Sequence, residues 1–150
     1  IAFCYGWLPV AVGYYLQAGA IPVLVHWLAT PIGLTILNVI LLNEFPDYTA
    51  DRAAGKANWV VRLGRERAAG IYAAIAAAGW LAMVLALRHG APLWALLAYA
   101  PILILSLGVS VAVLRGRWRD HATLDGLCGA NLLVNLGTTA VLLAAYTLFP

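Results

Sequence analysis

The sequence predicts an all-α membrane protein, a polytopic bundle of transmembrane helices. Of its 150 residues, 64% are hydrophobic and only 10% are charged, whereas an average soluble domain is about 45–50% apolar and about 25% charged. All charged side chains except Arg88 lie in two short segments, 44–67 and 115–125. The long uncharged stretches can cross a bilayer as helices, because about 20 apolar residues span its hydrocarbon core. The same composition excludes a disordered chain, a collagen and a disulfide-stabilised secreted domain.

Five helices are expected, separated by segments rich in glycine, proline or charge. These residue types end or begin helices, because glycine tolerates unusual dihedral angles and proline fits the first helical turn. Pro9, Pro31 and Pro101 lie inside the apolar stretches. We expect them to kink the helices without ending them, because neighbouring groups satisfy the freed carbonyls in a membrane. The expected helices cover about residues 1–16, 22–42, 68–87, 93–114 and 124–148.

Lysine and arginine predict the orientation of these helices. Of the nine, five lie in 44–67 and three in 115–125, whereas the turn at 17–22 has none and the turn at 88–92 has one. Five helices in series place both charged segments on the same side of the lipid bilayer. The positive-inside rule puts that side in the cytoplasm, as expected in the inner, or plasma, membrane. Because topology explains the net charge of +3, nucleic acid is not an expected partner.

The first charged segment carries carboxylates in a pattern that suits a divalent cation. Asp47 and Asp51 are four residues apart, so on a helix they would share one face at about 5–6 Å between Cβ atoms. Like charges at this spacing repel unless a cation lies between them. Magnesium is commonly bound by one or two carboxylates together with substrate phosphates, and basic residues such as Lys56 pair with phosphate.

The alternative for so short a motif is a solvated loop in which aspartate and arginine side chains pair at the surface. The position of the motif argues against it, because the motif follows 43 uncharged residues at the expected membrane boundary. We expect Pro46 to begin the helix that carries the two aspartates and Asn43 to cap it.

This segment resembles the second aspartate motif of the UbiA superfamily of intramembrane polyprenyltransferases. The form N-x3-D-x3-D-R-x2-G-K…V-R-L-G is most similar to the 1,4-dihydroxy-2-naphthoate prenyltransferase branch. Residues 13–19, G-Y-Y-L-Q-A-G, also resemble the G-x-Y-Y-x-Q-x-G stretch of that branch. Two positions depart from the family pattern: Glu44 replaces a more usual Asn, and Asn58 stands where Thr or Ser is frequent. The matching positions are Asn43, Asp47, Asp51, Gly55, Lys56 and residues 60–64.

The resemblance implies a nine-helix fold around a central cavity, with two aspartate motifs on the cytoplasmic side. The five helices expected here would be helices five to nine, so residues 1–150 would form the C-terminal part of a single prenyltransferase domain. The N-terminal helices and the first motif, N-D-x-x-D-x-x-x-D, would lie outside these residues. We therefore expect residues 1–150 alone to lack activity.

The activity implied by the resemblance is transfer of a polyprenyl chain from polyprenyl diphosphate to an aromatic acceptor. The acceptor would be 1,4-dihydroxy-2-naphthoate, in menaquinone biosynthesis, or another such as 4-hydroxybenzoate. Mg²⁺ held by Asp47 and Asp51 would assist ionisation of the diphosphate, which Lys56, Arg62 and Asn43 would bind. A transporter or scaffold that needs no Mg²⁺ is the alternative outside enzymes. A phosphatidyl-transferring enzyme would require a D-G-x-x-A-R element, which does not occur.

Some polar residues outside this motif receive structural interpretations. Asn131 and Asn135 share one side of the last expected helix, where polar side chains commonly bond to another helix; contact with substrate is the alternative. His26 is expected to bond to a neighbouring helix. His121 and Asp125 are expected to cap a helix or lie at the surface, with metal binding as the alternative.

Overall fold

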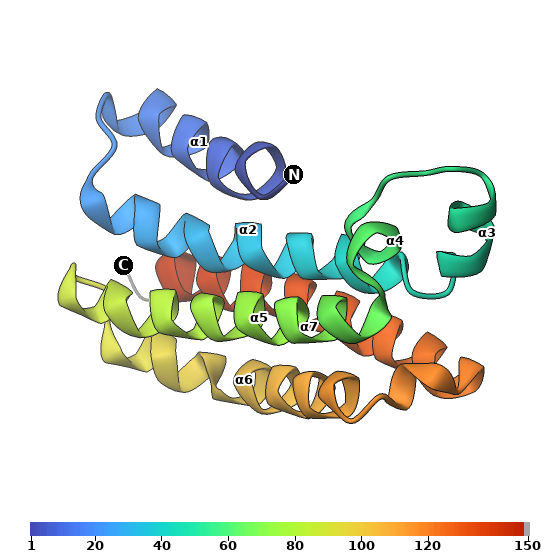
Figure 1. Ribbon diagram of the computed structural model, residues 1–150. Coiled ribbons are helices and arrows are strands. Elements are labelled where there is room, and N and C mark those ends of the chain that lie inside the picture. Colours follow the sequence, from blue (N-terminus) through green and yellow to red (C-terminus); the bar gives the residue numbers. More distant parts are fainter. Residues whose placement is uncertain (149–150) are drawn as a thin grey trace.

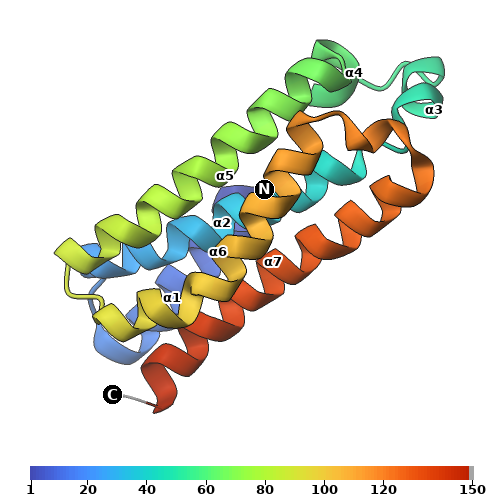
Figure 2. The ribbon, with the colours of Figure 1, turned by 90° about the horizontal axis from the view of Figure 1, so that it is seen from below.

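The computed structural model describes residues 1–148 and places four long helices side by side (Figure 1). Each helix packs on the next around the bundle: α2 on α5, α5 on α6, α6 on α7, and α7 on α2. Figure 2 shows the axes of the four helices running roughly along one direction. These helices are α2 (Val23–Asn43), α5 (Arg65–Arg88), α6 (Leu93–Leu114) and α7 (His121–Leu148).

A shorter helical stretch precedes α2 and lies against it. It consists of a π-helical segment, η1 (Ala2–Trp7), that continues into α1 (Leu8–Ala18). Gly6 and Gly33 let η1 approach α2 closely, because a Cβ added at Gly6 would lie 2.1 Å from the Gly33 Cα. Gly19, with φ of 69°, ends α1 in the left-handed region, and extended Pro22 leads into α2.

The prediction of an all-α polytopic bundle is confirmed, since each of the five expected ranges contains a helix in the described residues. Four of these helices, α2, α5, α6 and α7, are long and apolar enough to cross a membrane. The chain is therefore an integral membrane protein by this measure. Helices α2 and α6 continue through Pro31 and Pro101, as predicted. Helix α5 begins at Arg65, three residues before its expected start, because charged side chains at a helix end can remain in water.

Neutral polar side chains join three of the long helices inside the bundle. The Asn38 amide on α2 donates to the Tyr72 backbone carbonyl on α5 at 3.1 Å, and the Tyr72 hydroxyl donates to Asn131 Oδ1 on α7 at 2.8 Å. The Asn135 amide donates to Thr35 Oγ1 on α2 at 2.9 Å. We call these five residues the interhelical network. The expectation that Asn131 and Asn135 bond to other helices is confirmed.

His26, which lies near the start of α2, bonds to a neighbouring helix, as predicted. The Trp7 indole donates to His26 Nδ1 at 2.9 Å, and the two rings are stacked with centroids 5.5 Å apart. This contact fastens the end of η1 to the first turn of α2.

Candidate functional site

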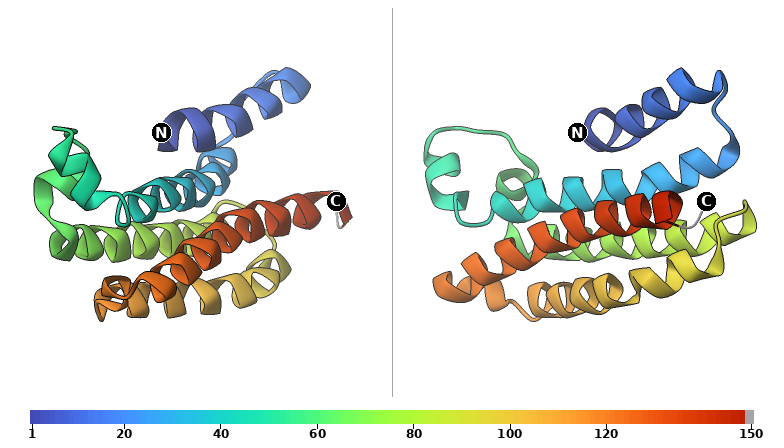
Figure 3. Two further views of the ribbon diagram at one scale, coloured as in Figure 1. Left: turned by 90° about the vertical axis from the view of Figure 1, so that its right-hand side faces the viewer. Right: turned by 180° about the vertical axis from the view of Figure 1, so that it is seen from behind.

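The two charged segments lie at the same end of the bundle, as predicted from five helices in series. The segment 44–64 contains two short helices, α3 (Tyr48–Ala53) and α4 (Trp59–Leu63), and projects beyond the end of α2 (Figures 1 and 3). The second segment contains a 3₁₀ turn, η2 (Arg117–Arg119), that packs on α6 and α7. We call residues 44–64 the motif loop.

The prediction that Pro46 begins the aspartate-bearing helix and that Asn43 caps it is wrong. Asn43 is the last residue of α2, and α3 begins only at Tyr48, directly after Asp47. The cause is Phe45, which is fully buried and packs with the core beneath the loop. Its backbone N–H bonds to the Leu42 carbonyl at 3.1 Å, so residues 44–47 finish α2 with a turn and do not start a new helix.

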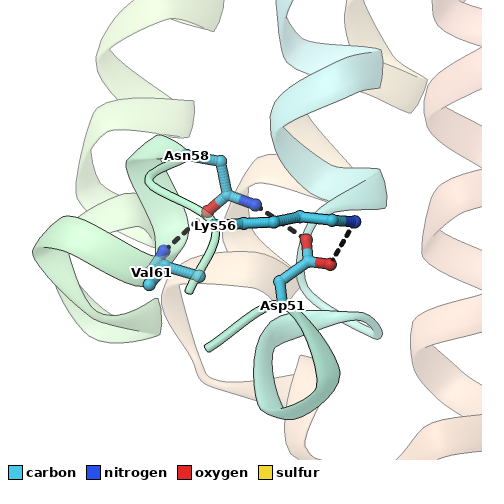
Figure 4. A network of polar contacts seen from close by, with 4 residues as sticks. All are labelled: Asp51, Lys56, Asn58 and Val61. Carbon is cyan, nitrogen blue, oxygen red and sulfur yellow. Dashed lines mark hydrogen bonds and ion pairs between the residues drawn. The ribbon is translucent and has the colours of Figure 1, made fainter. Parts of the chain in front are cut away.

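Asp51 is the buried member of the aspartate pair, and its two carboxylate oxygens have different partners (Figure 4). Lys56 Nζ lies 2.5 Å from Oδ1, and the Asn58 amide donates to Oδ2 at 2.9 Å. Gly55, with φ of 69°, allows the chain to turn back, so that the Lys56 backbone N–H also bonds to the Asp51 carbonyl at 2.9 Å. The sequence-predicted residues Asp51 and Lys56 are thus brought into direct contact.

Asn58 has a second role in the motif loop. Its Oδ1 accepts a hydrogen bond from the Val61 backbone N–H at 2.8 Å and caps α4. A single amide therefore links the Asp51 carboxylate to the start of α4. Sequence reasoning noted Asn58 only as a departure from the family pattern; its place immediately before an apolar run was the signal for a helix cap.

Asp47, Asn43 and Arg62 are exposed, and their side chains take no part in the contacts of the Asp51 carboxylate with Lys56 and Asn58. The Asp51 backbone N–H bonds to the Asp47 carbonyl at 2.8 Å, so the two aspartates lie one helical turn apart. Among the described residues, no three His, Cys, Asp or Glu side chains form a group that could hold a metal ion by themselves. Any cation bound here would need ligands beyond these two carboxylates.

Charge and burial shift the pKa values of two groups in the motif loop. The hydrogen bond and negative charge of Asp51, with a smaller contribution from Asp47, raise the pKa of Lys56. Lys56 is therefore held in its charged form beside Asp51. Burial raises the pKa of Glu44, and the charge of Asp51 raises it further, although a hydrogen bond from the Val60 backbone lowers it.

The second charged segment supports the motif loop through Trp118, which sequence reasoning did not single out as a site residue. The buried Trp118 ring meets Phe45 edge to face, with centroids 5.5 Å apart. The Arg65 guanidinium lies 5.0 Å from the ring centroids of both Trp118 and Tyr48. Such cation–π contacts are attractive, so they hold the start of α3 against the second segment. A tryptophan between two arginines was the only sequence signal.

His121 Nδ1 lies 3.3 Å from Asp125 Oδ2 and both side chains are exposed, so the surface interpretation is confirmed. The residue that caps α7 is Asp120, whose Oδ2 accepts from the Thr123 backbone N–H at 2.9 Å. The hydrogen bonds from Thr123 lower the pKa of Asp120. These groups explain how α7 begins and are separate from the Asp51 centre.

The donor chemistry of Asp47 and Asp51 fits one face of a magnesium site. Carboxylate oxygens are the hard ligands that Mg²⁺ prefers, and it usually completes its shell with water and substrate phosphates. The Lys56 ammonium already neutralises the charge of the Asp51 carboxylate. The Lys56 side chain is largely exposed.

The chain belongs to the UbiA prenyltransferase family, because the profile of that family matches residues 1–125. The match extends from η1 through the motif loop and into the first turn of α7. Members of this family are membrane enzymes that transfer polyprenyl groups to aromatic acceptors. No curated protein and no solved structure matches the chain.

Proposed function

We propose that this protein transfers a polyprenyl chain from polyprenyl diphosphate to 1,4-dihydroxy-2-naphthoate, a step of menaquinone biosynthesis. The observation that carries the proposal is the Asp51–Lys56 pair, a buried carboxylate neutralised by an exposed lysine at the end of an apolar bundle. A diphosphate with Mg²⁺ can exchange with this pair, because the cation binds carboxylate while lysine binds phosphate. Membership of a prenyltransferase family supports this interpretation.

The residues of the motif loop have separate roles in this proposal. Asp47 and Asp51 would hold Mg²⁺, and the chemistry that it supplies when bound is neutralisation of the leaving diphosphate. The Lys56 ammonium would leave the Asp51 carboxylate and pair with the diphosphate. Exposed Arg62 and Asn43 would add donors to the outer oxygens.

The reaction itself requires little further covalent chemistry from the protein. The C–O bond of the allylic diphosphate breaks, and its electron pair leaves with the diphosphate. An electron-rich carbon of the acceptor then attacks the allylic cation and loses its proton. Exclusion of water protects this cation from hydrolysis.

Apolar space beside α2 supports binding of an isoprenoid chain. A cavity of about 520 Å³ lies between α1, α2 and α7, and a second of about 290 Å³ shares Pro9, Val10, Ile32 and Thr139 with it. The first is lined mainly by apolar side chains such as Leu28. Together they offer a path along α2 suited to a hydrocarbon chain.

The test is a transfer assay on the full-length protein in membranes, with Mg²⁺, a polyprenyl diphosphate and either 1,4-dihydroxy-2-naphthoate or 4-hydroxybenzoate. We expect prenylated naphthoate and its loss in Asp51→Asn, whereas Glu66→Gln, an exposed carboxylate on α5, should remain active. Product only with 4-hydroxybenzoate would reassign the acceptor. Absence of product with both would contradict the proposed function.

We also propose that the motif loop faces the cytoplasm from the inner membrane, since eight of the nine Lys and Arg residues lie in the two segments at that end. Single cysteines at Ala53 and Ala91 test this, because these alanines lie at opposite ends of the bundle. A membrane-impermeant thiol reagent added outside intact cells should label position 91 alone. Labelling of position 53 alone would reverse the orientation.

A further inference from the structure

Arginine side chains gather where α5 begins and α6 ends. Of the eight lysine and arginine residues at this end of the bundle, five belong to the start of α5, the end of α6 and η2. The ion pair between Arg119 and Glu66, at 3.3 Å, joins η2 to the first turn of α5. The positive-inside rule explains on which side of a membrane such residues lie, but it does not require them to gather. We call the five residues the arginine cluster: Arg65, Arg67, Arg115, Arg117 and Arg119.

Two members of the arginine cluster are held by other side chains. The Arg65 guanidinium lies over the rings of Tyr48 and Trp118. The Arg119 guanidinium lies 4.4 Å from the Trp118 ring centroid and also pairs with Glu66. These contacts fix η2 against α5, so they also fix the backbone positions from which the other members project.

The remaining members of the cluster keep their charge available. Arg67, Arg115 and Arg117 are exposed, and their guanidinium groups form no hydrogen bond or ion pair within residues 1–148. Arg117 interacts electrostatically with Asp120, whose carboxylate is already bonded to Thr123. A planar guanidinium binds phosphate through two parallel hydrogen bonds. The free members therefore suit a ligand that carries a phosphate.

An apolar face of α6 leads directly to two of these free arginines. Leu107, Val111 and Leu114 are exposed and follow one another along one side of this membrane-spanning helix, since their spacing of four and three residues keeps them on one face. Arg115 comes one turn after Val111, at the end of the same face. A bilayer places hydrocarbon chains against such a face and headgroups at its end.

The apolar face and the free arginines together match a molecule with hydrocarbon chains and an anionic head. Arginines just outside a membrane span attract anionic lipids, and this attraction falls off within a few ångströms of the surface. A soluble phosphate would gain nothing from Leu107, Val111 and Leu114. The combination therefore favours a lipid over a soluble anion.

We propose that Arg115 and Arg117 bind the phosphate headgroup of an anionic phospholipid whose chains lie along Leu107, Val111 and Leu114. This inference goes beyond the proposed function, because it concerns a lipid site and does not depend on the reaction. The site belongs to the segment that supports the motif loop, since Trp118 packs on Phe45.

The test measures the affinity of the full-length protein for lipid in a neutral detergent, from the rise of its unfolding midpoint as lipid is added. The lipids are phosphatidylglycerol, which is anionic, and phosphatidylcholine with the same chains, which has no net charge. We expect tighter binding of phosphatidylglycerol by wild type. Arg115→Gln combined with Arg117→Gln should weaken this binding by about 30-fold, or about fivefold for each arginine, and leave binding of phosphatidylcholine unchanged.

Two further variants separate this site from a general effect of charge. Arg88→Gln removes an exposed arginine at the opposite end of the bundle and should bind phosphatidylglycerol as wild type does. Arg115→Lys combined with Arg117→Lys keeps both charges and should retain most of the preference for the anionic lipid.

Equal affinity of wild type for the two lipids would overturn the inference. An unchanged affinity for phosphatidylglycerol in the double glutamine variant, or an equal loss in Arg88→Gln, would overturn it as well. Glycerol phosphate, which lacks the chains, should raise the midpoint far less than phosphatidylglycerol at the same concentration, and an equal rise would contradict a lipid site. The proposed function is tested separately, by the transfer assay.

Discussion

Polar side chains gather in two regions of this bundle, and the two groups are built differently. The interhelical network is neutral and joins residues that are 34 to 100 positions apart in the sequence. The Asp51 centre contains charged groups, and its side-chain contacts all lie within residues 51–61. A network that fixes helices needs long-range bonds between neutral groups, whereas a centre that exchanges ligands needs a charge held by a mobile partner. Substitutions in the two regions should therefore affect different properties.

The largest expected effect is that of Asp51→Asn on prenyl transfer. The substitution keeps the shape of the side chain but removes the charge that Lys56 neutralises. We expect turnover to fall by about 10²–10³-fold, the usual loss when one electrostatic contact to a reacting group is removed. The midpoint of thermal unfolding should change little, because Lys56 is exposed and returns to water. Turnover near that of wild type would remove Asp51 from the site.

Lys56→Met should act on donor binding more than on turnover. If Lys56 moves from Asp51 to the diphosphate, its loss raises the KM for polyprenyl diphosphate by about tenfold, as for one charge-assisted hydrogen bond. The KM for the aromatic acceptor should stay constant. Lys56→Arg keeps the charge and should recover part of the donor affinity. Steady-state kinetics with each substrate varied in turn measures both, and an unchanged donor KM in Lys56→Met would contradict this role.

In the interhelical network, Tyr72→Phe should lower stability and leave substrate binding unchanged. The variant removes the hydroxyl that donates to Asn131, and hydrogen bonds between membrane helices contribute about 0.6 kcal/mol on average and up to about 1.7 kcal/mol. Reversible unfolding in a mild detergent measures the difference. Tyr5→Phe is the matched control, since Tyr5 is 70% exposed. A changed donor KM together with unchanged stability in Tyr72→Phe would contradict the separate roles of the two regions.

The smallest expected effect is a difference in how the stabilisation by the two helix caps depends on pH. Asn58 caps α4 with a neutral amide, whereas Asp120 caps α7 with a carboxylate whose pKa is lowered from 3.8. A lowered pKa means that the stabilising effect is present above the unfolded value and is lost as pH falls through the folded one. Unfolding midpoints between pH 3 and 7 should therefore converge for wild type and Asp120→Ala at the acidic end. A constant difference across that range would contradict the assignment.

The sequence predicted the helices better than it predicted the contacts of the motif loop. Uncharged stretches located the helices, because a bilayer imposes length and apolarity on them. Spacing also identified Asp51 and Lys56, which lie five residues apart and need only one turn at Gly55 to meet. Burial of Phe45 moved the start of α3 away from Pro46, and no spacing reveals which aromatic ring a core will bury.

Contacts between distant segments were the least predictable part of the site. Trp118 reaches Phe45 from 73 positions away in the sequence, and its partner Arg65 lies on a third element. Such contacts depend on how α5, α6 and α7 pack, which helical periodicity alone does not specify. Asn131 and Asn135 were predicted to bond to other helices because a lipid environment offers few other partners, but their partners Tyr72 and Thr35 were not.

We propose above that Asp51 holds a cation together with a diphosphate. Its most direct test is the affinity of the full-length protein for a non-ionising polyprenyl thiodiphosphate, measured with and without Mg²⁺. In wild type, Mg²⁺ should tighten binding of the analogue, and the analogue should tighten binding of Mg²⁺ by the same factor. Asp51→Asn should abolish this coupling while Glu66→Gln retains it. Coupling of equal size in Asp51→Asn and wild type would show that Asp51 does not hold the cation.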